Sequence, residues 1–80
     1  NYPNPFNPTT VINYQLPAND FVSLNVFDLT GHKITTLVHK QQTAGSYSVI
    51  FDATKLKSGI YFYAIQFGQY KSVRKMLFLK

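Results

Sequence analysis

The chain has 80 residues, which is one domain near the lower size limit for a self-sufficient core, and 45% of them are hydrophobic. It has no cysteine, which excludes disulfides and thiol chemistry, and no apolar run approaches the ~18 residues that cross a bilayer. The net charge of +5 admits nucleic acid, anionic lipid headgroups or acidic glycans as partners, but no nucleic-acid-binding motif accompanies it, so a solvated basic surface is the simpler interpretation.

The first eight residues hold three of the four prolines. Residues that precede proline favour extended conformations, so 1–8 is predicted to be a stiff lead-in, with Phe6 closing one open end of the core. This opening has neither the basic nor the apolar region of a secretory signal. We therefore expect residues 1–80 to be a single domain excised from a longer protein.

Two half-buried strands are predicted at Thr9–Leu16 and Phe21–Leu29, because apolar residues occupy every second position in both. Residues 17–20 between them have the composition of a turn. A tight reversal follows the second strand. In it, Asp28 is expected to accept hydrogen bonds from backbone amides, and Gly31 to adopt a positive φ.

A third strand is predicted at Lys33–Val38, with Ile34 as its clearest core residue, because its many β-branched residues disfavour a helix. The polar stretch 39–44 leads to a fourth strand at Ser46–Phe51. Asp52–Ser58 is the one place where a helical turn is expected.

The densest strand-forming run is Gly59–Phe67, which is apolar on both faces and therefore predicted to be a central strand. The hydroxyl of Tyr61 is expected to reach back to a backbone carbonyl a few residues earlier. Gly68–Gln69 suits a two-residue hairpin turn, so the last strand, Tyr70–Lys80, should pair with the central one. Regularly spaced strands without an amphipathic helix favour two antiparallel sheets packed face to face over a closed barrel.

No catalytic chemistry is evident in the sequence. His32 and His39 flank the third strand on opposite sides, roughly 23 Å apart at ~3.3 Å per residue, and so should not share a metal or a substrate. Asp28 and Asp52 each stand beside a turn, where capping of backbone amides explains them. No serine lies in the Gly-x-Ser-x-Gly motif of a catalytic nucleophile. We expect no enzyme activity, no catalytic residue, no metal and no cofactor.

The segment Val73–Lys80 is apolar on both faces yet carries basic residues. At a sheet edge, such a strand invites aggregation unless it is covered, and it offers a partner a site for strand addition. The alternative is a strand shared between the core and a neighbouring loop.

Several segments together resemble the C-terminal sorting domains of type IX secretion, the Por system, over essentially the whole chain. The segments that carry this resemblance are Tyr2-Pro3-Asn4-Pro5-Phe6-Asn7-Pro8 with Thr10, Leu24-x-Val26-Phe27-Asp28-x-x-Gly31-x-Lys33, Ala44-Gly45-x-Tyr47-x-Val49-x-Phe51-Asp52, Leu56-x-x-Gly59-Ile60-Tyr61 and Lys75-Met76 with the apolar residues up to Lys80. Family members often have Trp where Phe51 stands and His where Tyr47 stands. Both departures keep an inward aromatic residue.

The resemblance implies an all-β, immunoglobulin-like antiparallel sandwich of about six to seven strands, at the C-terminus of a larger exported protein. A separate N-terminal signal would take the cargo to the periplasm. The outer-membrane translocon would then recognise the domain and deliver the cargo to the cell surface or the medium. In many members a sortase-like peptidase removes the domain, and the cargo is released or coupled to anionic lipopolysaccharide.

The resemblance also implies roles for individual residues. Those expected to take part in translocon recognition are Gly59, Tyr61, Lys75, Met76, Leu77, Phe78, Leu79 and Lys80. Those expected to form structural motifs are Tyr2, Pro3, Asn4, Pro5, Phe6, Asn7, Pro8, Asp28, Gly31, Gly45 and Asp52. Neither nucleic acid nor a transmembrane segment is part of this expectation.

Alternative functions share the fold. Similar sandwiches occur in flagellar hook-capping proteins and as spacer or accessory binding modules of multidomain secreted proteins, and the fold does not separate these classes. A glycan-binding module would need exposed aromatic residues such as Tyr2, Phe62 or Tyr70. The position of Lys75-Met76 close to the chain end favours sorting.

Overall fold

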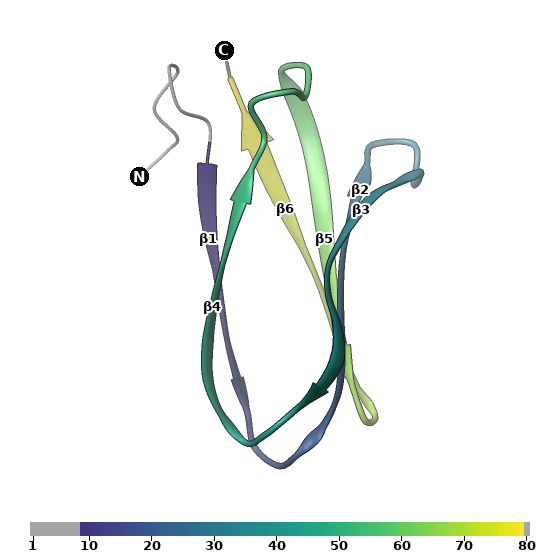
Figure 1. Ribbon diagram of the computed structural model, residues 1–80. Coiled ribbons are helices and arrows are strands. Elements are labelled where there is room, and N and C mark those ends of the chain that lie inside the picture. Colours follow the sequence, from purple (N-terminus) through teal and green to yellow (C-terminus); the bar gives the residue numbers. More distant parts are fainter. Residues whose placement is uncertain (1–8, 80) are drawn as a thin grey trace.

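The computed structural model describes residues 9–79 and shows six antiparallel strands, with no helix in that range (Figure 1). The strands are β1 (Thr9–Leu16), β2 (Asp20–Asp28), β3 (Lys33–Gln42), β4 (Gly45–Asp52), β5 (Gly59–Phe67) and β6 (Tyr70–Phe78). The predicted Phe6 plug and the end of the last strand at Lys80 lie outside the described residues.

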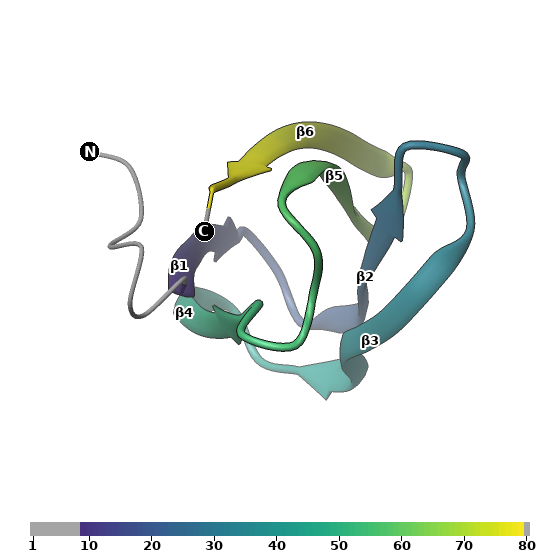
Figure 2. The same ribbon diagram turned by 90° about the horizontal axis from the view of Figure 1, so that it is seen from above.

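The strands form two sheets that enclose the core between them, which confirms the predicted sandwich (Figure 2). One sheet holds β1 and β4, and the other has the order β3-β2-β5-β6. In the larger sheet two hairpins, β2–β3 and β5–β6, are joined by the antiparallel pairing of β2 with β5. β5 therefore has a neighbour on each side, as its two apolar faces predict.

The core consists of alternate residues from all six strands, because successive side chains of a strand point to opposite faces. On β2, the side chains of Val22, Leu24 and Val26 are all 0% exposed. The other buried apolar residues are Ile12, Leu16, Val38, Phe51, Ala53, Tyr61, Ile65, Met76 and Phe78. In the described part of the chain, no polar or charged residue is buried.

Two turns have the predicted geometry. In the reversal after β2, the carboxylate of Asp28 accepts hydrogen bonds from the amides of Thr30, at 2.9 Å, and His32, at 3.0 Å, while Gly31 has a φ of 88°. Between β5 and β6, the two-residue turn has a φ of 55° at Gly68, which L-residues rarely adopt.

The predictions for the third strand were partly wrong. β3 runs to Gln42 instead of ending at Val38, because Asp20–Ser23 pair with residues 39–42 and extend the hairpin. Ile34 is only half-buried, and Val38 is the core residue of this strand. Register shifts between β2 and β3 change which face successive residues occupy, so simple alternation fails there.

The predicted helical turn at Asp52–Ser58 was also wrong. Residues 53–58 form a non-helical connection with one turn, in which the amide of Leu56 donates to the carbonyl of Ala53 at 2.9 Å. Ala53 is fully buried, and Leu56 packs against the core as expected of an anchor. The connection is held by side-chain contacts with the core, which require no helix.

Candidate recognition surface

β6 is an edge strand of the four-stranded sheet, with β5 as its only strand partner among residues 9–79. Its side chains alternate: Met76 and Phe78 are buried, at 8% and 1% exposed, whereas Leu77 and Leu79 are 53% and 55% exposed. The strand is therefore part of the core on one face and a surface on the other. The strand addition expected for this segment stays a prediction.

Phe78 fixes the end of β6 to both sheets. Its ring meets Phe51 of β4 at a centroid distance of 5.9 Å and Tyr61 of β5 at 5.8 Å. Gly59 lies directly opposite Phe78 in the β5–β6 pairing, and Tyr61 lies opposite Met76. The structure thus brings together four of the residues expected to be recognised, and three of them, Tyr61, Met76 and Phe78, are buried.

The turn between β5 and β6 determines which backbone groups of β6 are free. In a two-residue hairpin the residues that flank the turn, here Phe67 and Tyr70, exchange hydrogen bonds, and bonded and non-bonded pairs then alternate. Residues 72, 74, 76 and 78 therefore bond to β5. The backbone N–H and C=O groups of residues 71, 73, 75 and 77 point away from the sheet, toward any strand that adds to this edge.

Tyr61 also holds the connection that leads into β5. Its hydroxyl donates a hydrogen bond of 2.7 Å to the backbone carbonyl of Lys57, four residues earlier, as predicted. Because Tyr61 is 8% exposed, its ring packs in the core while its hydroxyl secures the loop. Tyr61 thus fixes the position of β5 and, because β6 pairs with β5, also the position of β6.

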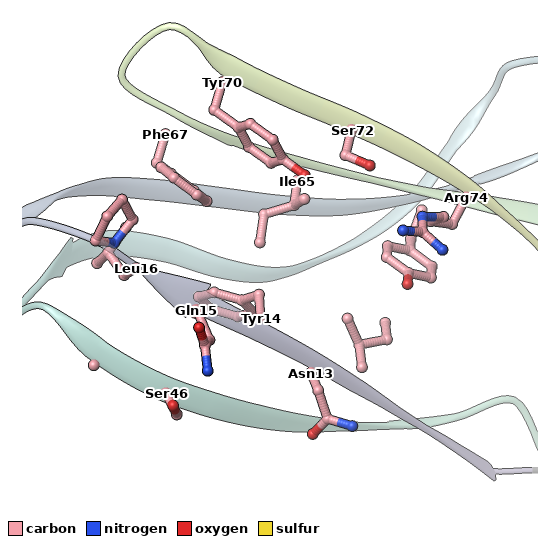
Figure 3. A pocket seen from close by; sticks show the side chains of 14 residues that line it. Asn13, Tyr14, Gln15, Leu16, Ser46, Ile65, Phe67, Tyr70, Ser72 and Arg74 are labelled. Carbon is pink, nitrogen blue, oxygen red and sulfur yellow. The ribbon is translucent and has the colours of Figure 1, made fainter.

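A groove of about 760 Å³ opens between β1 and the β5–β6 hairpin, where the two sheets diverge (Figure 3). Tyr14 and Leu16 line one side, and Phe67, Tyr70 and Arg74 line the other. The ring of Tyr14 stacks on Tyr47 at 5.3 Å, and its hydroxyl donates to Gln42. Burial raises the pKa of Tyr14, although the hydrogen bond to Gln42 partly offsets this effect.

The remaining motif residues occupy turns and strand ends. Hydrogen bonds from the Thr30 side chain and the His32 amide lower the pKa of Asp28 below its usual value. Gly45 begins β4, and Asp52, at the end of β4, accepts from the amide of Thr54 at 2.9 Å. The motif residues Tyr2 to Pro8 and the terminal Lys80 lie outside the described residues.

The two histidine side chains lie apart from one another. Within residues 9–79, no group of three or more His, Asp or Glu side chains could hold a metal. His39 packs edge-on against Phe21 at 4.8 Å, and the backbone amide of His32 belongs to the Asp28 turn. Residues 9–79 contain no helix that could span a membrane.

Sequence reasoning missed two features of this surface. It did not identify the groove, because the divergence of β1 from β6 depends on the packing of the two sheets. Nor did it identify the residues that pair across the outer face of the larger sheet, such as Phe27 with Phe62. The available signal was Phe27, an outward aromatic residue of the second strand. Its neighbour on the next strand follows only when the strand order is known.

The family described as "Secretion system C-terminal sorting domain" matches residues 1–79 of the chain. No curated protein and no solved structure is significantly similar to this chain. The match covers every strand described above and the proline-rich lead-in.

Proposed function

This chain belongs to the family of secretion system C-terminal sorting domains, the sorting signals of type IX secretion, and we propose that the secretion machinery recognises it at the free edge of β6. A sorting signal acts on an attached cargo, so the partners are that cargo and the type IX machinery. The destination is the cell surface or the extracellular space. The family is defined by this signal and not by a catalytic reaction.

The division of β6 into a buried and an exposed face carries the proposal. Met76 and Phe78 hold the strand in the sheet, while the outward backbone of residues 71, 73, 75 and 77 is free to pair. Strand addition to an exposed edge obtains affinity from main-chain hydrogen bonds and specificity from alternate side chains. Lys75 and Leu77 are the exposed side chains that would provide that specificity.

The expected recognition residues then fall into two groups. Lys75, Leu77 and Leu79 contact the translocon directly, and Lys80 continues the same segment. Gly59, Tyr61, Met76 and Phe78 act as positioning residues, because they pack together and set the course of β6.

We extend the proposal to the fate of the domain. The cargo passes through the periplasm, and a sortase-like peptidase removes the domain while the cargo is released or attached to the surface. Mass spectrometry of an exported reporter tests this step. A reporter without the domain supports removal, and a reporter that retains the intact domain contradicts it.

A proline at position 73 tests the edge directly. The N–H of Val73 points away from β5, so Val73→Pro blocks strand addition without removing a bond of the β5–β6 pair. Val73→Ala is the matched control, because it shortens the side chain and keeps the N–H. With both variants folded, we expect a periplasm-targeted reporter to be exported with Val73→Ala and retained with Val73→Pro. Equal export of the two variants would contradict recognition by strand addition.

A further inference from the structure

The outer face of the four-stranded sheet carries an aromatic pair between two lysines. In the strand registers, Lys33 of β3 lies opposite Phe27 of β2, Phe27 opposite Phe62 of β5, and Phe62 opposite Lys75 of β6. We call these four residues the lysine-flanked row. With neighbouring strands ~4.8 Å apart, the backbones of its two lysines are separated by about 14 Å.

Apolar residues continue on both sides of the row. Ile60 lies opposite Leu77 on one side, and Ala64 opposite Val73 on the other. Leu77 and Val73 are 53% and 55% exposed, while Phe27 and Phe62 are half-buried between their neighbours. The face thus has an apolar centre, and its lysines stand at the margins.

Within residues 9–79, no aspartate lies beside these lysines on the outer face. The chain has only three acidic residues. Asp28 has its carboxylate in the β2–β3 turn, and Asp52 lies on β4 in the other sheet. Asp20 has the same parity as the inward residues Val22 and Leu24 of β2 and lies at the far end of the sheet, where it accepts from the amide of Phe21 at 2.8 Å. Lys71, opposite Gln66, adds a further positive charge to the outer face.

We propose that this face docks onto an acidic protein surface of the secretion machinery, with an aliphatic centre against Phe27 and Phe62 and carboxylates that pair with Lys33 and Lys75. The inference rests on the proposed sorting function and adds the kind of surface that the partner presents. It concerns the whole sheet face, from β3 to β6, and so goes beyond the edge of β6.

The shape and charge of the face favour a protein partner. Phe27 and Phe62 are half-buried between their neighbours, whereas side chains that insert into a bilayer need to protrude. A second copy of the domain would place lysines against lysines, which is electrostatically unfavourable. An acidic protein surface with an aliphatic centre satisfies both the apolar centre and the positive margins.

Charge reversal of the two lysines tests the proposal. The variant Lys33→Glu with Lys75→Glu is compared with Lys55→Glu plus Lys57→Glu, which makes the same change of net charge in the β4–β5 connection. Each is fused to a periplasm-targeted reporter in a bacterium with a working type IX system. We expect the first variant to reduce the export rate at least about tenfold, since opposed like charges at an interface are strongly unfavourable. The second variant, and Lys33→Arg, should be exported at nearly the wild-type rate. Lys33→Glu alone should also lower export, because Lys33 lies on β3, at the opposite edge of the sheet from β6.

Several outcomes would overturn the proposal. Equal export of the two charge-reversed variants, with the wild-type fusion exported, removes the docking face and leaves the sorting function intact. Retention of the wild-type fusion refutes the sorting function itself. Thermal unfolding of each purified variant establishes that it is folded, and the single variant Lys33→Glu replaces the double variant if that one is not.

Two measurements separate the other partners. Binding of the wild-type domain to vesicles with anionic phospholipid, lost in Lys33→Glu with Lys75→Glu, would identify a membrane surface instead. A dimer in sedimentation velocity that the same variant dissociates would identify a second copy. Suppressor mutations that restore export by replacing an acidic residue of a secretion protein support the proposal. Suppressors confined to lipid-headgroup synthesis contradict it.

Discussion

The ring of Phe78, on β6, meets the ring of Phe51, on β4, at a centroid distance of 5.9 Å and an interplanar angle of 63°. This contact joins the edge strand of the large sheet to the small sheet. The segment that we propose is recognised is therefore also part of the core. Truncation of Met76–Lys80 removes the buried side chains of Met76 and Phe78, so loss of export after truncation follows from a lost signal and from a lost fold alike.

Phe78→Ala should destabilise the domain by about 3–5 kcal/mol, because it leaves a cavity where a side chain with 1% exposure was packed. Leu77→Ala is the matched control, since Leu77 is 53% exposed, and should cost less than about 1 kcal/mol. Urea unfolding of the purified domain measures both free energies. Similar losses for the two variants would mean that Phe78 is not packed as described.

Tyr61→Phe should reduce the free energy of unfolding by about 1 kcal/mol. The substitution keeps the ring in the core and removes only the 2.7 Å hydrogen bond to the Lys57 carbonyl. Tyr70→Phe serves as the control, because Tyr70 is 51% exposed and lies in the hairpin. If the two substitutions have the same effect in thermal unfolding, the hydroxyl of Tyr61 does not hold the connection.

Gly68→Ala should cost at least about 1–2 kcal/mol, because the φ of 55° lies in the left-handed region. A Cβ at this position would also lie 2.8 Å from a carboxylate oxygen of Asp20. The double variant with Asp20→Ala separates the two causes: backbone strain remains in it, whereas the contact does not. Full recovery of stability in the double variant would show that the contact alone is responsible.

The lowered pKa of Asp28 predicts that the stability of the fold decreases at acidic pH. A carboxylate whose pKa is lower in the folded state contributes stability above its unfolded value of 3.8, and this contribution disappears as the pH falls through the folded pKa. Asp28→Asn should lower the melting temperature at pH 7 and flatten its decline below about pH 4. Parallel melting curves for the wild type and Asp28→Asn across that range would contradict the role of the turn.

Much of the fold could be predicted from the sequence where neighbours along the chain decide the structure. Alternation placed β1 correctly, and the requirement for a positive φ placed Gly68 in the hairpin turn. Alternation failed in β3, where the register shifts against β2 make Val38 the core residue in place of Ile34. Those shifts depend on a partner strand and leave no local signal.

The candidate site, too, could be predicted from the sequence only in part. The apolar, basic character of β6 is visible in the sequence, and so is its pairing with β5. The lysine-flanked row is not, because Lys33 and Lys75 come together only through the strand order β3-β2-β5-β6. Side chains that are far apart in the chain share a face only after the pairing of β2 with β5 is known.

Export of a periplasm-targeted fluorescent reporter fused to residues 1–80 tests the central claim most directly. The fusion is compared in cells with and without a working type IX translocon, beside a fusion to the folded Val73→Pro variant, whose β5–β6 pairing is intact. The account predicts reporter at the cell surface or in the medium only for the intact domain and only with the translocon. Retention of the wild-type fusion in the periplasm of competent cells, with the domain folded, would contradict it.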